Sequence, residues 1–246
     1  MPRTKRYFEN GKIYHVILRR MGNELLFKDQ NDYFRMIFYL YECNTPKNIV
    51  LRLQREKRKA EKLAQVKGQT PVHFHSKREL LVEIFAFCLM PNHIHLLLRQ
   101  IVDKGISKFI QKVASGYSAY FNLKYKTQFR GHFYHDRFTA VPIDNDHQLQ
   151  LVFVYIHTNP ISLVEPGWKE LKVDNPENAL DFLQKYRWSS YLDYIGKKNF
   201  PSVLQKESLA QIFSFENLQE LVKQWVNYKH NLSEGIKETI KNISLE

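Results

Sequence analysis

Short apolar runs mark the strands of this chain. Residues 13–18 and 84–90 are largely apolar runs of six and seven residues, as expected of strands, and residues 93–98 return as the next strand. Pro91-Asn92 separates the second run from the third, which predicts a tight turn and a hairpin. Residues 133–143 read as a fourth strand.

The segments between these predicted strands show the apolar spacing of amphipathic helices. Apolar residues recur at helical spacing over 33–41, 106–121 and about 144–158, the last segment ending at Asn159-Pro160 because the residue before proline avoids helical geometry. Asp29 or Asn31 could cap the first of these helices, and a helix pair is expected around 204–228. The resulting order of elements predicts an α+β domain with helices packed on one antiparallel sheet.

One segment differs in character from the rest. Residues 51–67 carry charge almost throughout, which is typical of a solvated helix with ion pairs four residues apart, although an arm that contacts DNA is the alternative. We interpret about 48–82 as an insertion into a compact domain. The expected organisation is therefore one domain over 1–185 that contains this insertion, followed by a C-terminal helical extension over 186–246.

The charge balance narrows the class of partner. Lys and Arg number 37 and Asp and Glu 25 among 246 residues, so the net charge is +12, which favours a polyanion: nucleic acid or an anionic membrane surface. No stretch approaches 18 uninterrupted apolar residues, and the N-terminus does not resemble a secretory signal. The two cysteines lack metal spacing, as expected in a reducing compartment. We therefore expect a cytoplasmic protein, associated with the nucleoid through DNA and not with a membrane.

Two histidines on one strand are the first candidates for chemistry. His93 and His95 flank Ile94, and residues two apart on a strand point to the same face, so both imidazoles could bind one ion. A solvent-facing pair is the plainer reading of this pattern. His73 and His75 have the same spacing, but they lie at the edge of the charged insertion, where a preorganised metal site is not expected.

The helix before Asn159-Pro160 carries a candidate nucleophile. Tyr155 and Asn159 are one turn apart and lie beside the apolar stripe of that helix, where a side chain can be held firmly while its tip stays reachable. With 14 tyrosines in the chain, a packing role is the plainer alternative. A phenolate that attacks phosphorus needs help from a cation, because a free phenol has a pKa of about 10. Two imidazoles, an amide oxygen and substrate phosphates would suit Mg²⁺ or Mn²⁺.

The linked motifs resemble a known family. The segments are Leu89-Met90-Pro91-Asn92-His93-Ile94-His95-Leu96-Leu97-Leu98, then Arg130 to Phe138, then Tyr155-Ile156-His157-Thr158-Asn159-Pro160 and finally Arg187-Trp188-Ser189-Ser190-Tyr191. In this order they are similar to the REP-associated tyrosine transposases, the single-tyrosine transposases with a His-hydrophobic-His (HUH) motif that are related to the insertion-sequence-200 group. The resemblance covers roughly residues 7–46 and 83–196.

The resemblance implies a ferredoxin-like HUH nuclease fold that cleaves single-stranded DNA beside hairpins. Carried over to matching positions, His93 and His95 become metal ligands, Asn159 a third ligand and Tyr155 the nucleophile. Attack would leave a 5′-phosphotyrosine and a free 3′-hydroxyl, which allows strands to be rejoined. Either a monomer or a homodimer would fit this activity.

Basic residues near these motifs are candidates for DNA binding, because cations on phosphates and rings under bases hold single strands. They are Arg19, Arg20, Lys108, Lys112, Arg130, His132, His135 and Arg137, with Lys124 and Lys126 as further candidates. An ordinary strand with charged outward residues is the plainer reading of the 130–137 stretch. Two other functions stay open: a hairpin-binding regulator that no longer cuts, and an RNA-binding protein of ferredoxin-like topology, which would lack the usual aromatic motif.

Overall fold

The computed structural model describes residues 7–66, 78–127, 132–135, 138–168, 173–212 and 218–227. Its strands are β1 (Ile13–Arg19), β2 (Val82–Leu89), β3 (His93–Gln100) and β4 (Thr139–Ile143). Its α-helices are α1 (Gln30–Glu42), α2 (Leu51–Val66), α3 (Gly105–Tyr125), α4 (Asp146–Thr158), α5 (Pro176–Lys185), α6 (Tyr191–Tyr194), α7 (Lys206–Ala210) and α8 (Leu218–Asn227). Short 3₁₀ helices are η1 (Met21–Asn23), η2 (Asn159–Leu163), η3 (Pro166–Trp168) and η4 (Pro201–Val203).

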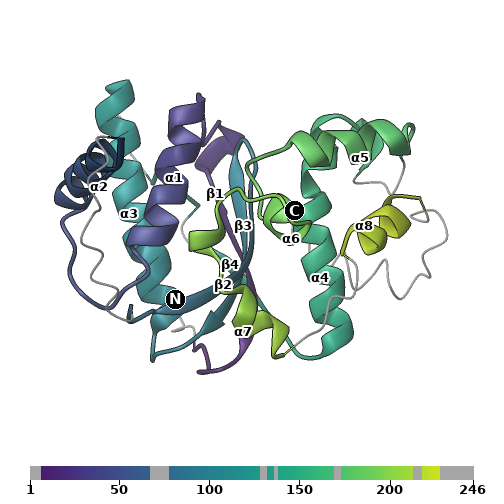
Figure 1. Ribbon diagram of the computed structural model, residues 1–246, viewed down its shortest axis with the longest axis horizontal. Coiled ribbons are helices and arrows are strands. Elements are labelled where there is room, and N and C mark those ends of the chain that lie inside the picture. Colours follow the sequence, from purple (N-terminus) through teal and green to yellow (C-terminus); the bar gives the residue numbers. More distant parts are fainter. Residues whose placement is uncertain are drawn as a thin grey trace.

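The strands form one antiparallel sheet in the order β2-β3-β1-β4. Along the chain, the elements follow the β-α-β-β-α-β order of ferredoxin-like domains, with α2 added between α1 and β2. Helices α1 and α3 cover one face of the sheet, and α4 lies on the other (Figure 1). The predicted α+β, ferredoxin-like architecture is therefore confirmed.

The central strands are buried on both faces, which explains their nearly unbroken apolar runs. On β3, Ile94, Leu96 and Leu98 join the core beneath α1 and α3, while Leu97 joins the core beneath α4. Because side chains alternate along a strand, His93 and His95 face the same side as Leu97, toward α4.

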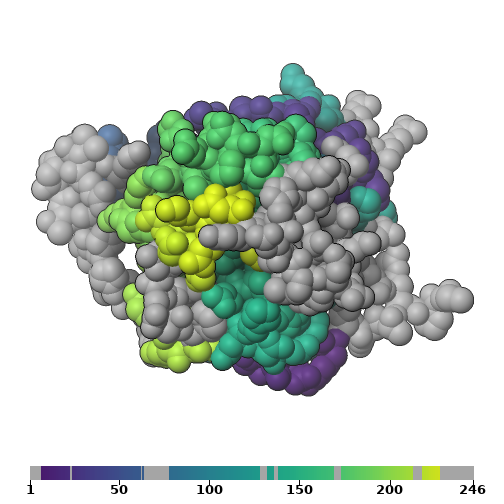
Figure 2. All heavy atoms as spheres, turned by 90° about the vertical axis from the view of Figure 1, so that its right-hand side faces the viewer, coloured from purple at the N-terminus to yellow at the C-terminus, as the bar shows by residue number. Residues whose placement is uncertain are grey.

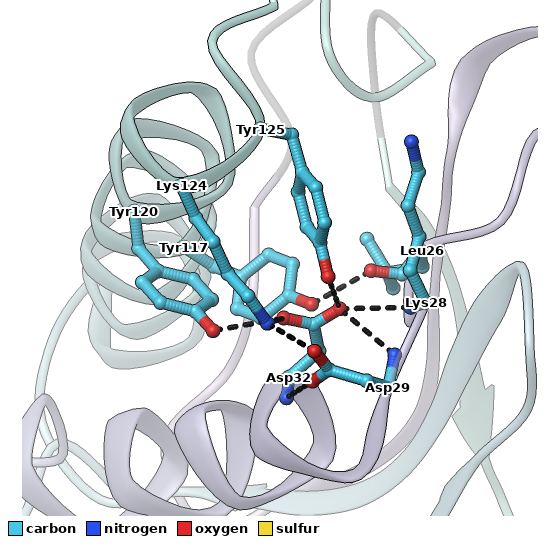
Figure 3. Close-up of polar contacts among 8 residues, drawn as sticks. All are labelled: Leu26, Lys28, Asp29, Asp32, Tyr117, Tyr120, Lys124 and Tyr125. Atoms are coloured by element: carbon cyan, nitrogen blue, oxygen red, sulfur yellow. Dashed lines mark hydrogen bonds and ion pairs between the residues drawn. The ribbon is translucent and has the colours of Figure 1, made fainter.

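A buried carboxylate ties the start of α1 to the end of α3 (Figure 3). The Asp29 side chain caps α1 by accepting a hydrogen bond from Asp32 N–H, and the Asp32 carboxylate accepts one from Asp29 N–H, which completes a capping box. The Asp32 carboxylate, which is fully buried, also accepts hydrogen bonds from Tyr120 at 2.8 Å, Lys124 at 2.7 Å and Tyr125 at 2.7 Å. Both helices are thereby fixed against each other on the face away from α4.

The helices after α4 cover its outer side. In Figure 2, α8 (yellow) lies over α4 (teal) and below the green helices, and α8 contacts both α4 and α5. The segment before α6 follows the free edge of β2: Leu89 N–H donates to Trp188 O at 2.8 Å and Ser190 N–H to Phe87 O at 3.0 Å. In the described part of the C-terminal extension, α8 therefore packs against α4, and the segment before α6 pairs with the edge strand.

The structure shortens one predicted strand and adds a 3₁₀ turn after one predicted helix. Only Thr139–Ile143 forms a strand in the 133–143 region, preceded by an isolated bridge between Tyr134 and Arg20. The α4 helix ends at Thr158, as predicted, but the backbone continues as η2, because Pro160 stands in the first turn, where its missing N–H costs nothing. The predicted C-terminal helix pair corresponds to α7 and α8.

The charged segment forms the predicted helix, α2. Its Arg52 and Glu56 make an exposed ion pair one turn apart at 3.0 Å, and Arg58 pairs with Glu42 of α1. No helix in the described ranges has the length and apolarity needed to cross a bilayer.

Candidate functional site

Two imidazoles from β3 converge on the α4 side of the sheet. The Nε2 atoms of His93 and His95 lie 2.9 Å apart, and the side chains are 5% and 0% exposed. We call His93 and His95 the imidazole pair. Their spacing follows from the pleat of β3, which is hydrogen-bonded on both sides by β1 and β2 and therefore holds the two side chains in a fixed relation.

The remaining nitrogens of the imidazole pair are also occupied. His93 Nδ1 lies 2.6 Å from Asn92 Oδ1 in the β2–β3 turn, and His95 Nδ1 lies 3.0 Å from Nε2 of His15 on β1. His15 was not among the residues that the sequence singled out. A histidine inside an apolar strand was the available signal, but the pairing of β1 with β3 could not be seen without the fold.

Tyr155 approaches the imidazole pair from the opposite layer. Its ring centroid lies 5.6 Å from that of His95 and 6.0 Å from that of His15, both in edge-to-face geometry. The side chain is 8% exposed, at the margin of the core, as its position beside the apolar stripe predicted. The structure therefore brings together three predicted site residues, His93, His95 and Tyr155.

Asn159 stands one turn further along, at the end of α4. Its backbone N–H donates to Tyr155 O, and its side chain is 3% exposed. Residues four apart on a helix share a face, so the amide lies on the Tyr155 side of α4. Helix α4 reaches this position because Asn145 caps its start and because Leu149, Val152, Phe153 and Ile156 are buried, chiefly against the sheet and the neighbouring helices.

The imidazole pair fits a divalent cation. Two ligand atoms about 2.1 Å from an ion and at right angles to each other are about 3.0 Å apart, close to the observed 2.9 Å. Each imidazole also has a partner on its other nitrogen, the usual arrangement for ligating histidines. No cluster of three or more His, Cys, Asp or Glu side chains with metal-binding geometry occurs in the part of the chain that the structure describes. An amide and substrate oxygens would have to complete the coordination.

Basic residues surround one end of this site. Arg19 pairs directly with His93 across β1 and β3, so both side chains lie on the same sheet face. His135 N–H donates to Arg19 O at 3.1 Å, and the side chains of His135 and His132 are exposed. The strand ends therefore place Arg19 beside the imidazole pair, with His135 next to Arg19.

Other predicted DNA-binding residues have structural partners. The Arg20 guanidinium is buried over the rings of Phe133 and Phe121, at 4.0 and 4.4 Å, and pairs with Glu24 at 2.7 Å. On α3, beyond the sheet from Tyr155, Lys108 is exposed, whereas Lys112 Nζ donates to Thr45 O and Lys47 O at 2.6 and 2.8 Å.

Lys124 belongs to the Asp32 network at the far side of the sheet. Burial lowers the pKa of the Lys112 ammonium. Arg130, Arg137, His73 and His75 lie outside the described residues.

Comparison with known proteins identifies a transposase family and matching chains among the solved structures. Residues 49–159 match the family described as "Transposase IS200 like", a range that begins within the predicted insertion and includes His93, His95, Tyr155 and Asn159. The solved "Structure of the REP associates tyrosine transposase bound to a REP hairpin" aligns with 88% of this chain and 96% of its own, at 12% identity and a TM-score of 0.44. No curated protein matches. Over residues 49–159 the chain is similar to the IS200-like transposases, which confirms the resemblance predicted from its motifs.

Proposed function

We propose that this protein is a metal-dependent transposase of single-stranded DNA whose nucleophile is Tyr155. One observation carries the proposal: a tyrosine on α4 meets, at 5.6 Å between ring centroids, a histidine of the imidazole pair on β3. Nucleophile and cation-binding groups from different layers meet at one point, as phosphoryl transfer to a phenol requires. The matched family range supports the proposal, because all four proposed site residues fall within it.

The reaction forms one bond to phosphorus and breaks another. The Tyr155 oxygen attacks the phosphorus of a phosphodiester, and the bond from phosphorus to the 3′ oxygen breaks. The phenol loses a proton and the departing 3′ oxygen takes one up, so no co-reactant is consumed. A 5′-phosphotyrosine and a free 3′-hydroxyl result, and attack by a 3′-hydroxyl on the phosphotyrosine rejoins strands because the ester bond conserves the energy of the original linkage.

The chain supplies positioning and charge for this step. His93 and His95 through Nε2, with the Asn159 amide oxygen, would hold Mg²⁺ or Mn²⁺. When bound, such an ion neutralises charge on the phosphate oxygens. Arg19 beside the pair, with His132 and His135 on the neighbouring segment, would contact phosphates of the strand, and the +12 net charge favours the polyanion as a whole.

The substrate is proposed to be a single strand next to a hairpin, on the resemblance of the motifs. A protein that acts on such strands in a bacterium would reside in the cytoplasm with the nucleoid. The monomer and the homodimer both remain compatible with attack by Tyr155, and crosslinking of the DNA complex would distinguish them.

The decisive experiment follows a label through the covalent step. Purified protein is incubated with a pool of hairpin-flanked single strands with randomised flanks, with Mn²⁺ or with EDTA, and resolved on denaturing gels. Because the 5′ end of the downstream fragment becomes attached to Tyr155, a 3′ label should migrate with the protein and a 5′ label should appear on a shortened free strand. Tyr155→Phe should abolish the adduct, while Tyr7→Phe, which alters a tyrosine 80% exposed, should not.

Each outcome separates this proposal from its alternatives. An Mn²⁺-dependent adduct that requires Tyr155 supports the transposase. Tight binding of the same strands without any adduct would establish a hairpin-binding regulator instead. Preference for RNA of the same sequence over DNA would favour an RNA-binding protein. An undiminished adduct in Tyr155→Phe would assign the nucleophile to another residue.

A further inference from the structure

His15 is a buried polar residue that the proposed reaction does not use. It lies in β1 with 0% exposure, and its Nε2 atom is 3.0 Å from Nδ1 of His95. The two rings are nearly parallel, with centroids 5.2 Å apart, and the His15 ring also contacts the Tyr155 ring. His15 therefore touches one member of the imidazole pair and the proposed nucleophile at once.

The three imidazoles do not converge on one ion. His95 presents Nε2 to His93 and the opposite nitrogen, Nδ1, to His15. A cation between the two Nε2 atoms of the imidazole pair would thus lie on the far side of the His95 ring from His15. His15 is placed as a partner of a ligand and not as a ligand itself.

A neutral imidazole carries one proton, so these contacts allow two arrangements. In both, His93 Nδ1–H donates to Asn92 Oδ1, which leaves a lone pair on His93 Nε2. In the first arrangement, His15 Nε2–H donates to His95 Nδ1 and His95 Nε2–H donates to His93 Nε2. In the second, His95 Nδ1–H donates to His15 Nε2, and the two Nε2 lone pairs of the imidazole pair face each other.

Within these three contacts, the first arrangement places a proton between the two Nε2 atoms, whereas the second leaves two lone pairs facing each other at 2.9 Å, an arrangement that a cation between them would stabilise. Resting on the proposed function, we infer that His15 is the positioning residue of the cation site. It donates to His95 when the site is empty and accepts from His95 when the site is filled. The proton that His15 Nε2 gives up is the one that His95 Nδ1 receives. His95 Nε2 loses a proton to solvent and His15 Nδ1 gains one, so the net protonation is unchanged.

This role needs a side chain that can both donate and accept. An amide has both capacities and a glutamine reaches about as far as an imidazole Nε2, whereas an aliphatic side chain has neither capacity. Loss of an outer partner of a ligating histidine typically lowers metal affinity by about 10–100-fold. His15→Leu should therefore weaken cation binding strongly, and His15→Gln should largely preserve it.

The test measures Mn²⁺ affinity of the full chain by electron paramagnetic resonance titration, without DNA. We expect His15→Leu to bind Mn²⁺ about 10–100-fold more weakly than the wild type and His15→Gln to bind within about threefold of it. Val16→Ala is the matched control, because Val16 is fully buried in the same strand but packs beneath α1 and α3. It should lower stability without changing the Mn²⁺ affinity.

A second readout reports the proton directly. Nitrogen-15 imidazole spectra with and without Mg²⁺ should show the His95 proton on Nε2 in the empty site and on Nδ1 in the filled one. Wild-type affinity in His15→Leu, or a His95 tautomer that does not change with Mg²⁺, would overturn the inference. Two other results would overturn the proposed cation site itself: a wild-type protein that binds no Mn²⁺, or a His93→Ala variant that binds Mn²⁺ with wild-type affinity.

Discussion

His157 Nε2 lies 2.7 Å from Ser190 Oγ, and both side chains are completely buried. The same hydroxyl accepts a hydrogen bond from Phe87 N–H at 3.0 Å. His157 follows Tyr155 by two residues and so points to another side of α4, and burial lowers its pKa to about 3, so the imidazole is neutral. One serine thus connects the helix of the proposed nucleophile to strand β2.

Replacing this serine should loosen that connection. Ser190→Ala leaves the Phe87 N–H and His157 without their buried partner, which should lower the free energy of unfolding by about 1–3 kcal/mol. Urea denaturation measures the change. Ser118→Ala is the control, since its hydroxyl donates to Ser115 O on the surface of α3, and its effect should stay within about 0.5 kcal/mol. Equal effects for the two variants would contradict a linking role for Ser190.

Arg19 and Arg20 are neighbours in the sequence, but substitution of Arg20 should lower stability, whereas substitution of Arg19 should weaken DNA binding. Arg20→Ala removes a buried guanidinium from the rings of Phe121 and Phe133 and should cost about 2 kcal/mol of stability or more. Arg19→Ala should leave stability nearly unchanged but weaken binding of single-stranded DNA and reduce the slope of log affinity against log salt by about 1. Fluorescence anisotropy at several salt concentrations checks the slope, and a slope unchanged in Arg19→Ala would remove Arg19 from the interface.

The Asp32 network should be a major contribution to stability. Asp32→Asn leaves Lys124 facing a neutral amide inside a set of hydrogen bonds built for a carboxylate, which should cost about 3 kcal/mol in thermal or urea unfolding. Asp29→Asn is the matched control. Its side chain is 45% exposed and asparagine caps helices as well as aspartate, so its effect should be below about 1 kcal/mol.

The same carboxylate predicts a pH dependence. Burial alone would raise the pKa of Asp32, but hydrogen bonds from Lys124, Tyr125, the Lys28 N–H and Tyr120 outweigh it and hold the pKa below its usual 3.8. The contribution of Asp32 to stability is therefore complete above the unfolded-state pKa and is lost as the pH falls through the folded-state pKa. As the pH falls below the unfolded-state pKa of about 4, wild-type stability should fall more steeply than that of Asp32→Asn. Parallel curves would show that the carboxylate is not held ionised.

Gly105 should tolerate no side chain. It begins α3 against the carbonyl of Leu81, and a Cβ built there would lie 2.2 Å from that oxygen. Gly105→Ala must therefore shift α3 away from β2 and should lower stability by about 1–3 kcal/mol. Gly196→Ala has open space around its Cβ and a positive φ, so it should cost only the backbone strain, about 1 kcal/mol. Calorimetry of both variants would separate the clash from the strain.

Local pattern sufficed for most of the fold. The apolar runs gave β1, β2 and β3 to within two residues, because strands buried on both faces leave a continuous signal. The strand expected over 133–143 is shorter because Phe133 and Tyr134 turn into the core beneath α1 and α3 and pair with β1 only at a single bridge. The shorter strand depends on tertiary packing, which the alternation of apolar and polar residues along the sequence does not reveal.

The sequence could suggest neighbouring residues of the candidate site where those residues share one strand or one helix. His93 and His95 follow from strand alternation, and Tyr155 and Asn159 from helical spacing and resemblance. His15 was missed because its role depends on the register between β1 and β3, two strands 80 residues apart at the His15–His95 contact. The engagement of Lys112 with Thr45 and Lys47 was equally invisible, since it depends on how α3 packs against the end of α1.

The imidazole pair belongs to the sheet, whereas Tyr155 belongs to a helix held on it by packing and by the Ser190 contact. A hydrogen-bonded sheet resists distortion more than the seating of a helix on its surface does, so mild heating should displace the phenol before it disturbs the imidazoles. Loss of the proposed strand cleavage, together with weaker cation binding because Asn159 ends the same helix as Tyr155, would then precede the calorimetric transition. We therefore expect thermal inactivation of this protein to begin with a displacement of α4 relative to the sheet, before either the helix or the sheet unfolds.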